Sequence, residues 1–206
     1  LPDAYAVPEI TAAAASSDAV LFGCGIGRTP EVKEALKSLV TTSEAPLIID
    51  ADGLFALSQD MDMLEDKTCP VILTPHLGEM TRMSGDTVEE LTENPLLCAS
   101  RFAVKHGVTL VMKSARTVVA VPDGRTFVNI MGNSGLAKGG SGDTLAGIIA
   151  SLAAQGANSL SAAVCGVGIH ALSGDISKKK AGSEYSVTPL DLIDNLGAAF
   201  AEIEEM

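Results

Sequence analysis

The strongest structural signal in the chain is Gly132-Asn133-Ser134-Gly135-Leu136-Ala137-Lys138-Gly139-Gly140-Ser141-Gly142-Asp143-Thr144-Leu145-Ala146-Gly147, which runs directly into the apolar stretch 148–154. Because glycine has no Cβ, consecutive backbone N–H groups in such a loop can turn toward one bound anion. A helix that begins at the end of the loop adds its positive dipole end. The pattern predicts an anion-binding loop with phosphate as its guest.

Asp143 is the one acid in this segment. Because a carboxylate repels phosphate, its place beside such a loop indicates a general base for a hydroxyl that attacks the phosphate, as in a small-molecule kinase. The alternative is a glycine-rich turn in which Asp143 only caps a helix or lies in its first turn. A P-loop is disfavoured because Lys138 precedes two glycines and does not stand in a Gly-Lys-Ser/Thr ending.

The glycine-rich segment resembles the signature of the ADP/ATP-dependent NAD(P)H-hydrate dehydratases, which are carbohydrate-kinase-like members of the ribokinase-like superfamily. Three further segments resemble the motifs of that family in the right order, namely Asp50-Ala51-Asp52-Gly53-Leu54, Leu73-Thr74-Pro75-His76-Leu77-Gly78-Glu79-Met80 and Lys113-Ser114-Ala115-Arg116-Thr117. Four ordered motifs that cover most of the chain are far more specific than any one of them.

The resemblance implies that the ring hydroxyl of NADHX or NADPHX, the hydrated reduced cofactors, is phosphorylated by ADP or ATP with Mg²⁺. Loss of that phosphate then restores the dihydronicotinamide. It further implies site residues in three groups: the catalytic Asp143 with the amides of Gly140, Ser141 and Gly142; the substrate contacts Gly25, Gly27, His76 and Asp143; and the nucleotide contacts Lys113, Ser114, Ala115, Arg116, Thr117 and Gly142.

Glu79 stands where ribokinase-like proteins keep an acid that organises the metal, so the resemblance implies an outer-shell Mg²⁺ role. A first-turn acid on a helix that starts near Leu77 explains it equally well. His106 and His170 have no such motif and are expected to be structural. Ser114 replaces the usual glycine of the nucleotide motif, which affects backbone approach at that point.

The chain opens at Leu1-Pro2-Asp3, whereas the family usually carries an upstream strand and a glycine-rich turn. We expect one ribokinase-like domain over 1–206 that lacks this strand and turn. The sheet edge left open by that absence favours association into a homo-oligomer.

Composition agrees with a helix-covered parallel sheet: 47% of residues are hydrophobic, only 3% are aromatic, and tryptophan is absent. The formal net charge of −12 argues against nucleic acid and anionic membranes as partners. The four cysteines, Cys24, Cys69, Cys98 and Cys165, form no Cys-x-x-Cys pair and are expected to be reduced and mostly buried. No apolar run approaches the roughly 20 residues of a membrane span, and 1–11 lacks signal-peptide features, which favours the cytoplasm.

Short apolar runs alternate with helical patterns in the first part of the chain, which predicts parallel strands. The strands are expected at 19–22, 47–49, 71–73 and 108–112, with helices at 30–40 and 95–105. A Pro-Asp-Gly turn predicts a hairpin from 117–121 and 126–129. Three helices, at about 143–155, 160–179 and 189–205, are predicted to complete the fold.

Three alternatives remain at this level. Gly23-Cys24-Gly25-Ile26-Gly27-Arg28 partly matches a dinucleotide fingerprint and admits a Rossmann dehydrogenase, although Arg28 stands where the third glycine belongs. A ribokinase-like kinase for hydroxymethylpyrimidine or hydroxyethylthiazole would use the same loop. A non-catalytic nucleotide-binding module would bind without turnover. The sequence does not choose between ADP and ATP, or between NADHX and NADPHX.

Overall fold

A computed structural model describes residues 7–205, so the opening Leu1-Pro2-Asp3 lies outside the described part. One six-stranded sheet runs in the order of the sequence. Its strands are β1 (Val20–Phe22), β2 (Leu47–Ile49), β3 (Val71–Leu73), β4 (Thr109–Met112), β5 (Val118–Ala120) and β6 (Thr126–Val128). Strands β1 to β4 are parallel, and β5 and β6 are antiparallel to their neighbours.

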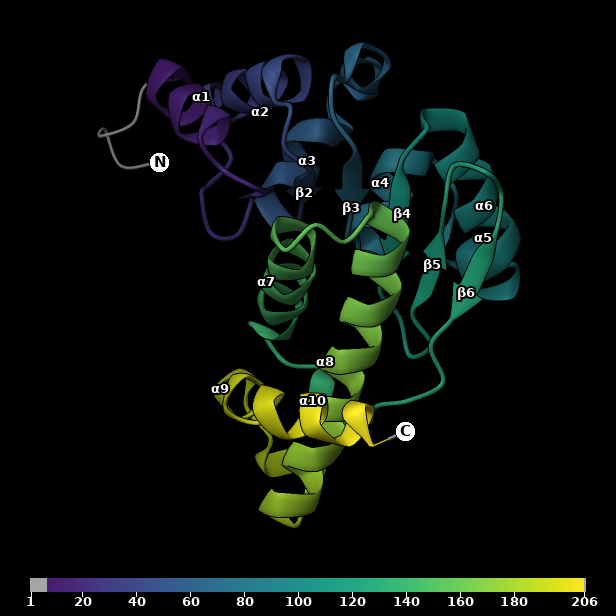
Figure 1. Cartoon of the computed structure of the whole chain (residues 1–206). Coiled ribbons are helices and arrows are strands. Elements are labelled where there is room, and N and C mark those ends of the chain that lie inside the picture. Colours follow the sequence, from purple (N-terminus) through teal and green to yellow (C-terminus); the bar gives the residue numbers. More distant parts are fainter. Residues whose placement is uncertain (1–6, 206) are drawn as a thin grey trace.

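Helices cover both faces of this sheet (Figure 1). One side carries α1 (Val7–Ala15), α2 (Pro30–Thr42), α3 (Ala51–Ser58), α4 (Leu77–Ser84), α5 (Val88–Glu93) and α6 (Pro95–His106), with a 3₁₀ helix at Met61–Asp66. The other side carries α7 (Ser141–Ala154) and α8 (Ser159–Ala181), and α9 (Pro189–Asp194) and α10 (Leu196–Glu204) pack on α8. Short 3₁₀ helices occupy Ser134–Leu136 and Glu184–Ser186.

The strands divide their side chains between the two faces with a period of two. In β2, Leu47 and Ile49 pack under α2–α6, whereas Ile48 packs under α7 and α8. All three side chains are fully buried. The continuous apolar run is therefore what a strand covered on both faces requires.

The predicted mostly parallel sheet, the late hairpin and the C-terminal helices are confirmed. The prediction of one helix over 189–205 was wrong, because the chain breaks at Asn195 between α9 and α10. The buried Asn195 amide donates to the Asp191 carbonyl at 2.8 Å and to Ser177 Oγ at 3.0 Å. These bonds stabilise the break. Helices α1, α3 and α5 had no counterpart in the sequence prediction.

The sheet topology excludes the Rossmann alternative. A Rossmann sheet reverses its strand order at a switch point, giving 3-2-1-4-5-6. Here the strands follow one another from β1 to β6, and the last two are antiparallel.

Helix α8 corrects another expectation. With 23 residues, it is long and apolar enough by length and composition to cross a membrane, so an apolar run of that size is present after all. Half of its apolar window is buried inside the protein, where α8 packs against α7 and the sheet. A core helix passes the same test, so this finding is only weak evidence for a span.

Candidate active site

The glycine-rich loop is tied to α8 and to the segment before α9. Asp175 of α8 accepts from the Gly132 amide at 2.9 Å and from Asn133 Nδ2 at 2.8 Å. At the other end, Lys138 Nζ donates to the carbonyl oxygens of Tyr185 and Val187. Lys138 therefore holds the loop in place, and the two carbonyls engage its ammonium group.

Helix α7 begins directly after this loop, two residues before the predicted start. Its N-cap, Gly140, has φ 91°, a left-handed conformation that favours glycine, and it provides no side-chain cap. Asp143 lies in the first turn. The start of α7 therefore presents backbone amides and one carboxylate at the loop mouth.

Ser141 is already engaged within the protein. Its amide donates to the Lys138 carbonyl at 3.1 Å, and its hydroxyl lies 3.1 Å from His170 Nε2. Its predicted role as a phosphate amide therefore stays a prediction that requires this amide to be released. His170 was expected to be only structural, yet it lines the cavity described below. Burial lowers the pKa of His170 to about 4, so its imidazole is neutral at pH 7.

The carboxyl ends of β2 and β3 place a buried acid opposite the loop. Asp50 is 1% exposed and follows β2 directly. Its Oδ1 accepts from Lys113 Nζ and from Thr74 Oγ1, both at 2.7 Å. This pairing compensates for the burial of the charge. The sequence placed Asp50 in a family motif at a strand end, but its pairing with Lys113 was not predicted.

Lys113 approaches the start of α7 because residue 142 is glycine. A Cβ at Gly142 would lie 3.1 Å from Lys113 Nζ. The ammonium group thus lies between Asp50 and the amide-rich end of the loop. A cation in this position complements a phosphate at the helix start.

One cavity of about 820 Å³ joins these elements, a volume within the usual range for a small-molecule site. It brings together ten of the predicted site residues: His76, Glu79, Lys113, Ser114, Ala115, Thr117, Gly140, Ser141, Gly142 and Asp143. Arg116, Gly25 and Gly27 are not among its lining residues. Arg116 lies within the nucleotide motif but is exposed on the surface, and the two glycines lie in the turn after β1.

The turn after β1 packs tightly against the backbone of Asp50 at Gly23, whereas the space around Gly25 and Gly27 is open. A Cβ at Gly23 would lie 1.8 Å from the Asp50 carbonyl oxygen. Gly25 and Gly27 have φ 66° and 84°, and no atom lies within 4 Å of where their Cβ atoms would be. Asp52 fixes this turn by accepting from the Gly27 amide at 3.0 Å.

His76 and Glu79 form the N-terminal cap of α4. His76 Nδ1 accepts from the Glu79 amide, and Glu79 Oε2 accepts from the His76 amide at 2.9 Å, a reciprocal capping box. The imidazole is nevertheless exposed, and both residues line the cavity. The structural explanation for Glu79 is therefore confirmed, and its metal role stays a prediction.

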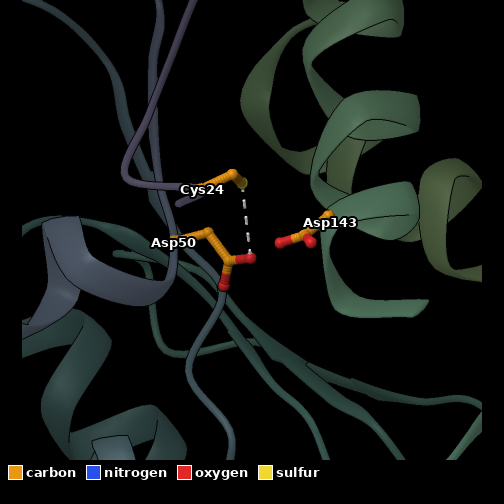
Figure 2. A group of neighbouring side chains, drawn as sticks. All are labelled: Cys24, Asp50 and Asp143. Atoms are coloured by element: carbon orange, nitrogen blue, oxygen red, sulfur yellow. Dashed lines mark hydrogen bonds between the residues drawn. The ribbon is translucent and has the colours of Figure 1, made fainter. Parts of the chain in front are cut away.

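Cys24 also lies near Asp143, although the sequence gave no reason to select it as a site residue. Its sulfur lies 3.9 Å from Asp50 Oδ2 (Figure 2). Burial, followed by the negative charges of Asp50 and Asp143, raises the pKa of the Cys24 thiol to about 12. Of the other cysteines, Cys69 and Cys98 are buried as expected, while Cys165 is exposed.

Comparison with known proteins agrees with this geometry. The sequence model of the NAD(P)H-hydrate dehydratase family matches residues 3–197. The chain belongs to that family. It is 38% identical over 190 residues to a bifunctional NAD(P)H-hydrate repair enzyme Nnr of Thermofilum pendens, covering 92% of this chain and 36% of the relative. It is also 38% identical over 168 residues to an ADP-dependent (S)-NAD(P)H-hydrate dehydratase of Neisseria meningitidis, covering 80% of this chain and 57% of the relative.

A solved structure gives the same picture. The ADP/ATP-dependent NAD(P)H-hydrate dehydratase of Bacillus subtilis, co-crystallised with ATP and Mg²⁺, superposes with a TM-score of 0.81 at 30% identity. The match covers 94% of this chain and 70% of that one. A ribokinase-like superfamily protein of Enterococcus faecalis superposes with a TM-score of 0.79 at 31% identity, over 95% of this chain and 68% of that one, which confirms the ribokinase-like fold. The chain spans only about a third to just over half of the length of the curated relatives named above.

Proposed function

We propose that this protein catalyses the ADP- or ATP-dependent dehydration of NADHX or NADPHX to NADH or NADPH. The observation that carries the proposal is the position of Asp143, in the first turn of α7 and in the same cavity as Lys113 and the glycine-rich loop. A base beside an anion-binding loop is what phosphorylation of a hydroxyl requires. Membership in the family and the activities for which the relatives are named support it.

In the reaction, the Asp143 carboxylate accepts the proton of the ring hydroxyl as the hydroxyl oxygen attacks the terminal phosphoryl group of the nucleotide. The Gly142 and Gly140 amides and the Lys113 ammonium stabilise the charge on that group. The P–O bond to the nucleotide breaks, and the ring carries a phosphate ester. Departure of this phosphate together with a ring proton then forms the ring double bond.

Lys113, Ser114, Ala115, Arg116, Thr117 and Gly142 are proposed to contact the nucleotide, and Gly25, Gly27 and His76 the hydrate. Both ligands then reach Asp143 in the 820 Å³ cavity, which His76 and Lys113 both line, and the hydrate extends further toward the open turn at Gly25 and Gly27.

The donor set suits Mg²⁺ that is bound chiefly through nucleotide phosphates. Glu79 lines the cavity, and its Oε2 is committed to the α4 cap, so this carboxylate would hold the ion through water. When bound, Mg²⁺ neutralises charge on the phosphate oxygens. The residues themselves orient the hydroxyl and the nucleotide.

The test is incubation of hydrated NADH or NADPH with ADP or ATP while the absorbance of the reduced cofactor is followed. The proposal predicts that the absorbance returns only when a nucleotide is present. Phosphorylation of a pyrimidine or thiazole alcohol without conversion of the hydrate would support the vitamin-precursor kinase instead. Nucleotide binding with neither reaction would indicate a non-catalytic module.

We further propose a homo-oligomer that resides in the cytoplasm and binds neither nucleic acid nor membrane. The net charge of −12 disfavours polyanionic partners. Among the described residues, strand β1 has a neighbouring strand on one side only, and an open sheet edge favours association. Light scattering coupled to size-exclusion chromatography measures the oligomeric state directly. A monomer at micromolar concentration would contradict the proposed homo-oligomer.

A further inference from the structure

Three side chains with metal-binding atoms converge at the carboxyl edge of the sheet. Cys24 follows β1, Asp50 follows β2, and Asp143 lies in α7 (Figure 2). The thiol sulfur and one oxygen of each carboxylate all lie within 4.8 Å of one another. Tetrahedral zinc places a sulfur and an oxygen ligand about 3.6 Å apart, so the 3.9 Å between Cys24 Sγ and Asp50 Oδ2 needs little adjustment.

One carboxylate oxygen of Asp50, Oδ2, points into this cluster and has only a weak hydrogen-bond donor (Figure 2). The side chain is 2% exposed, and both strong hydrogen bonds, from Lys113 and Thr74, go to Oδ1. Among the described residues, the donor recorded for Oδ2 is the Cys24 thiol at 3.9 Å, a weak interaction. A buried carboxylate oxygen with so weak a donor is well placed to accept a cation.

We propose that Cys24, Asp50 and Asp143 form a site for a borderline-soft divalent cation such as Zn²⁺, with water as the fourth ligand. Three protein ligands and one open position are typical of zinc in enzyme sites. The thiol selects zinc over Mg²⁺, which prefers six oxygen ligands. The site is therefore distinct from that of the Mg²⁺ that accompanies the nucleotide.

Binding proceeds without redox change. The Cys24 thiol loses its proton when it becomes a zinc ligand. The S–H bond gives way to a Zn–S bond, and one proton passes to solvent. Lys113 keeps its bond to Asp50 Oδ1 while the metal takes Oδ2, so the two cations share the carboxylate without competing for one atom.

A metal in this place would occupy the carboxylate that the proposed reaction needs as its base. Zinc is therefore expected to inhibit turnover reversibly, and a chelator should restore it. This inhibition rests on the proposed function, whereas metal binding does not.

The binding test titrates the purified full chain with Zn²⁺ by calorimetry in two buffers of different ionisation enthalpy. Wild type and Cys165→Ser, the control at an exposed thiol, should bind one zinc tightly and release about one proton. Cys24→Ser should bind at least about a hundredfold more weakly, since even indirect partners of a metal are worth 10- to 100-fold. Equal zinc affinities in the two serine variants would overturn the site.

A second measurement does not depend on the variants folding. Co²⁺ added to wild-type protein should give the thiolate-to-cobalt charge-transfer absorption, and its absence would overturn the proposal. In the turnover assay, zinc should lower the rates of wild type and of Cys165→Ser. The rate of Cys24→Ser should stay close to its own zinc-free value. Tight zinc binding at Cys24 without inhibition would uphold the metal site and contradict the role of Asp143 as base.

Discussion

The two faces of the sheet are packed with different kinds of residue. The face under α2–α6 buries large side chains such as Leu39, Met80 and Phe102. The face under α7 and α8 buries mainly small or β-branched ones, including Ala146 and Ala163. The bulky face carries most of the core, whereas the small-residue face lets two helices approach closely and brings Asp143 and His170 to one cavity. The bulky face therefore carries most of the stability, while the small-residue face carries Asp143 and α4 adds His76 and Glu79 to the same cavity.

The largest effect on stability is expected on the bulky face. Leu39→Ala removes a fully buried side chain from α2 and should lower the free energy of unfolding by about 2–5 kcal/mol. Nucleotide affinity of the folded protein should not change, because α2 contributes no residue to the cavity. Urea unfolding and calorimetric titration measure the two quantities, with Leu39→Met as the volume-conserving control. A loss of nucleotide affinity in Leu39→Ala would show that the packing of α2 also shapes the cavity.

On the small-residue face, His170 should make stability depend on pH. Its folded-state pKa of about 4 lies below the ordinary value of 6.5, so between these values the unfolded chain binds a proton that the folded protein does not. This contribution to stability is complete above pH 6.5 and is lost as the pH falls toward 4, by about 3 kcal/mol in all. His170→Gln should remove this component of the unfolding curves. Identical pH slopes in both proteins over that range would contradict it.

The contact between α7 and α8 can be tested with one substitution made at two places. A Cβ at Gly166 of α8 would lie 2.6 Å from Ile149 Cγ1, whereas at Gly147 of α7 no atom lies within 4 Å. Gly166→Ala should therefore cost about 1–3 kcal/mol of stability and weaken nucleotide binding by displacing α7. Gly147→Ala should stabilise the helix by about 0.5–1 kcal/mol. Thermal unfolding compares them, and effects of the same sign would argue against close helix packing.

The smallest effect is expected at His76, on the rim of the cavity. His76→Ala should weaken the binding free energy of NAD(P)H by about 1 kcal/mol, the value of one hydrogen bond, and leave ADP affinity unchanged. The same change also removes the α4 cap. His76→Ser is the matched control, because its hydroxyl can cap the helix but cannot replace the imidazole. Normal dinucleotide affinity in the serine variant would reduce His76 to a capping residue.

Sequence predicted the parts of the molecule whose signals are local. Runs of apolar residues located the first four strands, a Pro-Asp-Gly turn located the hairpin, and the glycine-rich loop with Asp143 located the start of α7. Residues whose roles depend on distant contacts were missed. Asp50 pairs with Lys113 across 63 positions, and His170 meets Ser141 across 29, so neither contact leaves a periodic pattern nearby. The break at Asn195 was missed for the same reason, since a bond to Ser177 on another helix stabilises it.

The central claim is that Asp143 acts as the base beside the anion-binding loop. Its most direct test measures ADP affinity and hydrate turnover of Asp143→Asn in one preparation, next to wild type. The amide is close in size to the carboxylate but cannot accept the hydroxyl proton, so affinity should be retained while turnover falls about a hundredfold or more. Turnover near the wild-type rate would contradict the claim and leave Asp143 as a first-turn residue of α7.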